Sequence, residues 1–294
     1  MFTHPKRVVV SVAASILAAV PAFAQAPPVY APGQMDQIVA RIALYPDPLL
    51  AQVLAASTYP NDIPAAAQWA DQHHYLTGQA LAAAISADQL PWDPSVQALL
   101  PFPSVLEMMA ADPNWTAELG NAFLASQPAV MDAVQRQRAL ASRYGYLRTN
   151  PQVIVGTGPY ITILPVNPAF VVVPAYDPAV VFFAPRPGFF VGGAIRFGFG
   201  ITVGGFFGPW GWGGAGIRFD WGAHSVWVNN VVWNRTWVNR AVYVHPGYAS
   251  FHRPGPNYVR PAESHALEPR TQVERNAAHE GRTPPREDHH GRGR

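Results

Sequence analysis

RIALYPDPLLAQVLAASTYP, residues Arg41 to Pro60, is the stretch that decides how the chain begins to fold. Asp47 stands directly before a proline. This pair is typical of a helix start, because the carboxylate can accept from free backbone N–H groups and proline lacks one. Four apolar side chains then share one face at helical spacing: Leu49, Leu50, Val53 and Leu54. The stretch therefore predicts a helix capped by Asp47 that ends near the second Tyr-Pro.

Helical spacing continues on both sides of this stretch, from Gln34 to Tyr144. Asp93 and Asp112 repeat the aspartate–proline pair and predict two more capped helices. The last helix should run from about Pro128 to Tyr144. We expect the side chains that follow at helical spacing to point into a core: Trp115, Leu119, Phe123, Val130, Met131 and Val134. We expect three arginines of the last helix to face solvent: Arg136, Arg138 and Arg143.

The N-terminus carries the pattern of a secretory signal peptide. Lys6 and Arg7 precede an apolar run from Val8 to Val20, and Ala22-Phe23-Ala24 forms a small-x-small cleavage site. The run is short for a membrane-spanning helix. We therefore expect cleavage after Ala24 and export to the periplasm or the outer cell envelope. The chain has no cysteine, so disulfides cannot stabilise it after export.

The charge is divided unevenly along the chain. Residues 25–150 hold five arginines and ten acids, whereas residues 151–294 hold thirteen arginines and eight acids. An exported protein of this kind is not expected to bind nucleic acid. An anionic envelope surface, or the acidic half of the same protein, is a better partner for the basic half.

The periodicity changes to that of strands at Asn150-Pro151. The runs 153–155 and 160–164 flank a turn that contains two glycines, which predicts a β-hairpin. Phe170 to Val173 and Val180 to Phe183 are further β-rich runs, separated by a turn at Tyr176-Asp177-Pro178. Because prolines bound these runs, we expect a small sheet of short strands packed on the helices.

Ordered motifs within this region resemble a known family, domain of unknown function 3300. They are IALYPDPLLAQVLAASTYP, PWDPSVQALL, FPSVLEMMA, NWTAELGNAF, VMDAVQRQR and VVVPAYDPAVVF. The resemblance covers roughly Met35 to Phe183, about half of the chain. It implies an exported protein of Gram-negative bacteria and brings no activity, cofactor or catalytic residue.

Gly188 to Gly216 interleaves twelve glycines with phenylalanine and tryptophan. Phe189 to Gly208 has the length of a transmembrane helix, but Arg196 in its middle and the many glycines oppose insertion. Alternating strands between Ile195 and Val203 are a second interpretation, and a flexible, associating segment is a third. In each case the exposed aromatic side chains favour contact with a partner.

Tryptophan and asparagine alternate with β-like spacing between Ser225 and Tyr243. Tryptophan can stack on a sugar and asparagine can hydrogen-bond to it, so this segment is a candidate glycan-binding face: Trp227, Trp233, Trp237, Asn229 and Asn234. The alternative is a pair of strands that buries its tryptophans against the glycine-rich stretch.

Other polar residues suggest chemistry less specifically. Three carboxylates would be the acids of an enzyme that acts on an envelope polymer: Asp71, Asp93 and Asp177. Asp71, His73 and His74 do not share a helix face, so a solvated helix end is favoured over a metal site. From His252 onward the chain lacks large aliphatic residues and is predicted to be disordered, and its scattered histidines are poor candidates for a metal site: His265, His279, His289 and His290.

The sequence thus predicts an α+β protein: a bundle of short helices, a small antiparallel β region, a Gly/aromatic segment and a disordered tail. The expected divisions are a signal peptide (1–24), a linker (25–33), a helical domain (34–149), a β-hairpin extension (150–184), a Gly/aromatic and Trp/Asn-rich segment (185–245) and the tail (246–294). We expect a non-enzymatic scaffold or interaction module without catalytic, cofactor-binding or metal residues. Its partner would be membrane, cell wall or another envelope protein.

Overall fold

A computed structural model describes residues 26–188, 191–203, 216–228 and 230–244. These residues all belong to one compact unit of the chain, and residues 252–294 lie outside them. The predicted signal peptide, the tail 246–294 and Asn229 also lie outside them, as does part of Phe189 to Gly208. Among the described residues, no helix has both the length and the apolar character needed to cross a bilayer.

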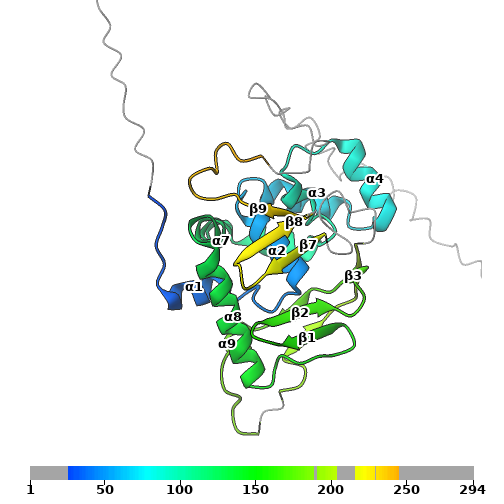
Figure 1. The fold of residues 1–294 in the computed structure, drawn as a ribbon. Helices are drawn as coiled ribbons and strands as arrows, with labels where there is room; N and C mark the ends of the chain where they lie inside the picture. The colour runs from blue at the N-terminus through cyan, green and yellow to red at the C-terminus, as the bar shows by residue number, and fades with distance from the viewer. Residues whose placement is uncertain (1–25, 189–190, 204–215, 229, 245–294) are drawn as a thin grey trace, which may run out of the picture. The chain divides into compact units, whose positions relative to one another are not determined.

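The N-terminal half of the described chain is helical (Figure 1). Its helices are α1 (Pro32–Val39), α2 (Asp47–Ser57), α3 (Ile63–Gln72), α4 (Gly78–Asp88), α5 (Pro94–Gln97), α6 (Pro103–Ala111), α7 (Pro113–Ala125) and α8 (Gln127–Arg143). Side chains cap several of them, since Asp93 accepts from the Ser95 N–H and Asp112 from the Trp115 N–H. These two predicted caps are confirmed.

Short strands follow, and every recorded pair of them is antiparallel. The elements are β1 (Val153–Thr157), β2 (Ile161–Pro165), β3 (Phe170–Val171), β4 (Pro174–Tyr176), α9 (Pro178–Val181), β5 (Ile195–Phe197), β6 (Ile201–Thr202), β7 (Ile217–Asp220), β8 (Ser225–Val228) and β9 (Val231–Trp233). β1 pairs with β2, β3 with β6, β4 with β5, and β7, β8 and β9 form a three-stranded sheet. The α+β class and the order of helices before small antiparallel sheets are confirmed.

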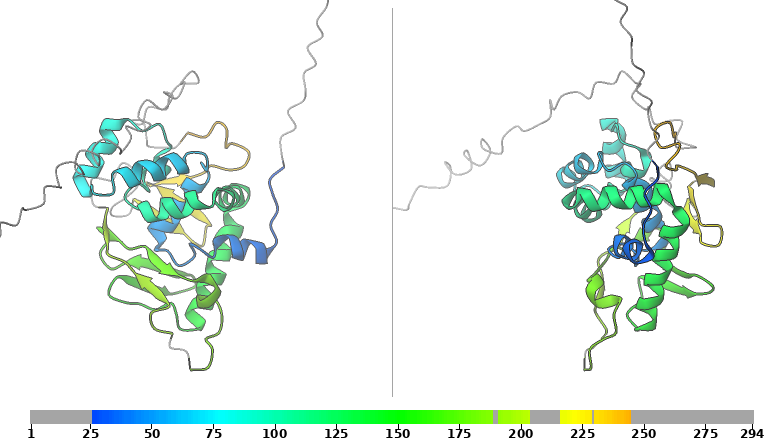
Figure 2. Two further views of the ribbon diagram at one scale, coloured as in Figure 1. Left: turned by 180° about the vertical axis from the view of Figure 1, so that it is seen from behind. Right: turned by 90° about the vertical axis from the view of Figure 1, so that its left-hand side faces the viewer.

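Helix α2 lies at the centre of the folded part, between helices and the β7–β8–β9 sheet (Figures 1 and 2). Each of its residues except Pro48 is buried, as is typical of a helix covered on all sides. It contacts α5 and α7 as well as β2 and β7. The helix within Arg41 to Pro60 is therefore the element around which the other helices and the strands pack.

Three local predictions are wrong. Asp47 does not cap α2, because the N-cap residue is Pro46 and the carboxylate is turned to other partners. Arg138 does not face solvent and is fully buried. Residues 178–181 form the short helix α9, capped by Asp177 at the Ala179 N–H, where a strand was expected.

Candidate functional site

A buried ion pair joins the helices to the strands. Arg138 on α8 donates to the Asp47 carboxylate at 2.6 Å and to the carbonyls of Ala43, Tyr45 and Ile161 at 2.8–2.9 Å. Arginine is suited to this position because its planar fork offers five N–H donors. Its partners come from the turn before α2 and from β2, so one side chain fixes both.

The Asp47 carboxylate completes this connection from the other side. It also accepts from the Ile163 N–H at 3.2 Å and from the Trp221 indole N–H at 3.0 Å. The Arg138 guanidinium lies 5.0 Å from the centre of the Trp221 ring. A carboxylate with so many donors is held in one position, and its role is to hold α2, α8, β2 and the β7–β8 sheet together.

A second buried arginine fixes the segment after β9. Arg235 donates to the carbonyl and hydroxyl oxygens of Thr58, both at 2.7 Å, and to the Arg240 carbonyl at 3.0 Å. Its guanidinium also stacks on Tyr59, 3.7 Å from the ring centre. Burial, followed by the charge of Asp93, raises the pKa of Tyr59 above the usual range for tyrosine. The segment after β9 is therefore anchored to the end of α2.

A shallow groove of about 440 Å³ opens beside this anchored segment. One wall is the junction of α7 and α8, and the other is β9 with the residues that follow it. Its lining residues are Pro27, Leu124, Ala125, Ser126, Gln127, Pro128, His224, Val232, Trp233, Asn234, Thr236, Trp237 and Val238. Apolar walls with a few amide, hydroxyl and imidazole groups are typical of sites that bind small or extended ligands.

Hydrogen bonds across the groove hold its two walls together. The Trp237 N–H donates to the Leu124 carbonyl at 2.8 Å, and the Gln127 amide donates to the Arg235 carbonyl at 3.3 Å. His224 lies 2.9 Å from the Asp132 carboxylate of α8. These bonds form between segments about 100 residues apart, so the groove depends on the assembled fold.

The structure separates the residues of the candidate glycan-binding face. Trp233, Asn234 and Trp237 line the groove, and Asn234 is exposed. Trp233 is fully buried and stacks on Phe123 of α7 with 5.2 Å between ring centres. The expected pair of strands is thus present as β8 and β9. Trp233, however, packs on helix α7, where the glycine-rich stretch was the expected partner. Its indole N–H has no acceptor among the described residues.

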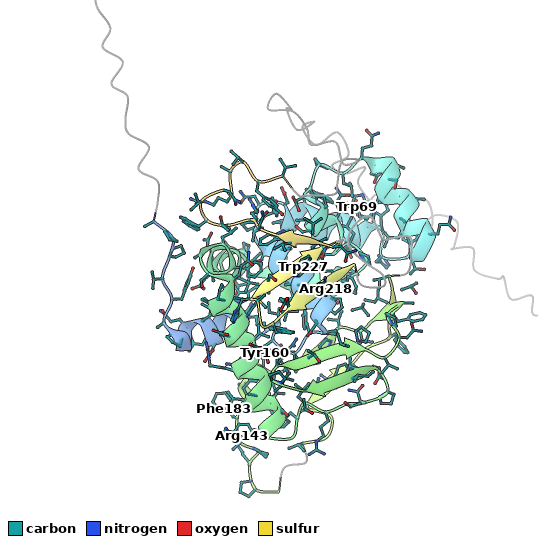
Figure 3. All side chains as sticks on the ribbon, viewed as in Figure 1. Trp69, Arg143, Tyr160, Phe183, Arg218 and Trp227 are labelled. Atoms are coloured by element: carbon teal, nitrogen blue, oxygen red, sulfur yellow. The ribbon has the colours of Figure 1, made fainter. Side chains whose placement is uncertain are left out.

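Trp227 lies outside the groove. It is half-buried on β8, where Arg218 of β7 lies 4.6 Å from its ring centre (Figure 3). Trp237 is also covered, since Arg240 lies 3.8 Å from its ring centre. Asn229 is outside the described residues. The sequence therefore identified part of one groove wall, and it gave no signal for the α7–α8 wall or for His224.

The candidate enzymatic carboxylates lie on separate elements. Asp93 caps α5, Asp177 caps α9 and Asp71 is exposed on α3. None of the three lines the groove. Within the described part of the chain, no group of three or more His, Cys, Asp or Glu residues is arranged to hold a metal ion. His73 instead stacks on Trp69 with 3.9 Å between ring centres.

Comparison with known proteins gives a family without an assigned activity. Residues 31–246 match the family described as "Protein of unknown function (DUF3300)". The chain is also 37% identical over 203 residues to "Uncharacterized protein YacH" of Escherichia coli (strain K12), an alignment that covers 55% of this chain and 33% of the relative. The match thus spans about a third of the length of that relative. No solved structure matches the chain.

Proposed function

This chain belongs to the DUF3300 family, and we propose that it is an exported, non-enzymatic interaction module of the cell envelope. The observation that supports this role best is the groove between the α7–α8 junction and β9. Its walls combine apolar surface with Asn234, Thr236 and Gln127, and hydrogen bonds to the fold hold both walls in place. A site that is already formed loses little conformational entropy when a partner binds.

A glycan chain is the candidate ligand that this lining favours most. The groove is open, as an extended polymer requires, and it offers amide and hydroxyl groups beside an apolar wall that contains the buried Trp233 and Trp237. Intrinsic tryptophan fluorescence should therefore change when peptidoglycan fragments or lipopolysaccharide are added. Unchanged fluorescence with both ligands would count against a glycan and leave a protein segment as the partner.

Substitution of two exposed valines tests whether the groove is the binding site. Val238 lines the groove and is 92% exposed, whereas Val242 lies on the same segment, is 76% exposed and is not a lining residue. Val238→Arg should block the groove and weaken binding of the fragments at least tenfold, and Val242→Arg should not. Equal affinities for the two variants would assign binding to another surface.

Cell fractionation tests the proposed location. We expect the expressed protein in the periplasmic fraction or in a membrane pellet from which carbonate releases it. Retention in the pellet until detergent is added would instead indicate a segment inserted in the bilayer. Recovery in the cytoplasmic fraction alone would refute the export on which the proposed role depends.

A further inference from the structure

Acidic residues are nearly absent from a long central part of the chain. Between Ala133 and Phe219 the sequence contains no lysine, one acid and seven arginines. The acid is Asp177, which caps α9 through the Ala179 N–H. This part comprises most of α8, all of β1 to β6 and the start of β7. Its charge is therefore strongly positive although that of the whole chain is only +2.

Three of these arginines already have partners in the fold. Arg136 pairs with Asp36, Arg138 pairs with Asp47, and Arg218 lies over the Trp227 ring. The other four are exposed: Arg143, Arg148, Arg186 and Arg196. No carboxylate of the described residues forms an ion pair with any of the four.

Three of these four arginines follow or end α8 and α9, and the fourth lies on β5, which pairs with β4 just before α9. Arg143 is the last residue of α8, Arg148 follows it, Arg186 follows α9 and Arg196 lies on β5. The C-terminal end of α8 and the helix α9 lie at the same end in all views (Figures 1 and 2). We call the surface formed by these four arginines and Phe183 the basic end.

Large apolar side chains are exposed on and near this surface. Phe183 is 62% exposed and lies toward the same end of the molecule as Arg143 (Figure 3). Ile154 and Leu164, which are opposite each other in the β1–β2 pair, are 48% and 45% exposed. An aromatic side chain among unpaired arginines is the combination that binds the interface of an anionic bilayer: phosphates attract the cations and the ring enters the headgroup region.

We propose that the basic end docks the protein peripherally on a bilayer that contains anionic phospholipid. This inference rests on the proposed envelope location and names the membrane as a partner. The surface is distinct from the groove, because α8 runs from Gln127 at the groove to Arg143 at the basic end, about 24 Å at 1.5 Å per residue. A protein docked in this way keeps the groove free for a second partner.

Vesicle sedimentation with the full chain tests the proposal. Vesicles that contain phosphatidylglycerol should bind the protein, vesicles of phosphatidylcholine alone should not, and added salt should weaken the binding. Each arginine near an anionic surface contributes about fivefold in affinity. Arg143→Gln should therefore weaken binding about 5-fold, and the triple variant Arg143→Gln/Arg148→Gln/Arg186→Gln on the order of 100-fold.

A matched control separates local contact from net charge. Arg41 is also a partly exposed arginine, but it pairs with Asp112 and lies before α2. Arg41→Gln removes the same charge and should leave vesicle binding unchanged. Equal losses for Arg41→Gln and Arg143→Gln, or unchanged binding of the triple variant, would overturn the proposal and assign any binding to another part of the chain.

Phe183→Ser tests whether the partner is a bilayer. We expect it to weaken vesicle binding several-fold and to leave binding to dextran sulfate unchanged. If Phe183→Ser leaves vesicle binding unchanged, the surface recognises a polyanion, and the lipid proposal is wrong. Val238→Arg tests the groove independently of the basic end. We expect it to lose glycan binding and to keep vesicle binding, whereas the triple arginine variant should lose vesicle binding and keep glycan binding.

Discussion

Arg138 illustrates how one residue can connect parts of the fold that are distant in sequence. Its side chain is fully buried and its donors reach three carbonyls and the carboxylate of Asp47. Removing a charge from water is unfavourable unless its partners replace the lost hydration. Here the partners belong to residues 43–47 and 161, so the arginine is stable in the core only when helices and strands are assembled.

Arg138→Met should destabilise the protein by about 3–5 kcal/mol, because it leaves Asp47 charged and buried without its cation. The quantity to measure is the free energy of unfolding in urea, followed by tryptophan fluorescence. The matched control is Arg136→Met, two residues earlier on α8, where the arginine forms an exposed pair with Asp36. We expect that variant to lose less than about 1 kcal/mol.

The double variant Asp47→Asn/Arg138→Met distinguishes an unpaired charge from lost packing. Asparagine carries no charge and keeps one acceptor oxygen, which can serve the N–H of Ile163 or that of Trp221, since the two donate to different oxygens of Asp47. We expect the double variant to be more stable than Arg138→Met alone. A double variant that is less stable would show that packing of the arginine, and not its charge, accounts for the loss.

Asp112 provides a second prediction at the scale of a residue. The hydrogen bond from the Trp115 N–H, and then the neighbouring Arg41, hold the pKa of its carboxyl below the usual value. A lowered pKa in the folded state contributes stability above the pKa of the unfolded chain, and this contribution is lost as the pH falls. Asp112→Ala should therefore lower the urea midpoint at pH 7 and have little effect at pH 2–3. Asp71→Ala, at an exposed site on α3, is the control that should not change the midpoint at either pH.

At the scale of elements, the crossing of α2 and α7 requires a glycine. A Cβ atom at Gly120 would lie 2.0 Å from the Ser57 carbonyl oxygen and 2.6 Å from its carbon. Both contacts are far below van der Waals distance and involve backbone, which cannot move like a flexible side chain. The two helices therefore approach this closely only because residue 120 has no side chain.

Gly120→Ala should destabilise the protein by about 1–3 kcal/mol through overpacking, although alanine favours a helix by about 1 kcal/mol over glycine. Gly33→Ala in α1 is the control, since nothing lies within 4 Å of the added Cβ and the intrinsic preference should prevail. Thermal unfolding of both variants measures the difference. A Gly120→Ala protein as stable as the native one would indicate that α2 and α7 can separate freely.

An element could be predicted when the partners of its key residue were close in sequence, and not when they were distant in sequence. Asp93 and Asp112 accept from N–H groups two or three residues away, so the aspartate–proline pattern located their helix starts. Asp47 has the same local pattern, but its partners are 91, 116 and 174 residues away, and no local pattern reveals them. The helix α9 was missed because Val180 to Phe183 is apolar and too short to show a helical period.

At the scale of the whole molecule, helices and strands share one hydrophobic core. Trp233 of β9 stacks on Phe123 of α7, and the hydroxyl of Tyr176 in β4 donates to the Ala40 carbonyl. The order of elements could be predicted from periodicity, whereas these contacts could not, since each joins residues about 100 or more apart. The same reason explains why only one wall of the groove could be predicted. Its residues Trp233, Asn234 and Trp237 were recognised by residue type, whereas the opposite wall is formed only when the chain folds.

Burial of tyrosines across this core makes the whole fold sensitive to alkaline pH. Burial raises the pKa of Tyr45 to about 12, and burial is also the largest cause of the raised pKa of Tyr59, Tyr176 and Tyr243. Tyrosine in an unfolded chain ionises near pH 10. A pKa raised by folding gives stability that is complete below the unfolded value and is lost as the pH rises toward the folded one.

We therefore expect a nearly constant free energy of unfolding between about pH 7 and 9 and a steep fall between about pH 10 and 12. The share of Tyr45 is about 3 kcal/mol, because its pKa differs by about two units between the folded and unfolded states. Tyr45→Phe should reduce the alkaline loss by about that amount, and Tyr75→Phe, at a site that is 70% exposed, should not. Urea titrations at each pH, with tyrosinate absorbance recorded in parallel, give both quantities. If tyrosinate absorbance rises fully near pH 10 while the native fluorescence persists, the tyrosines ionise without unfolding and the core does not control the alkaline transition.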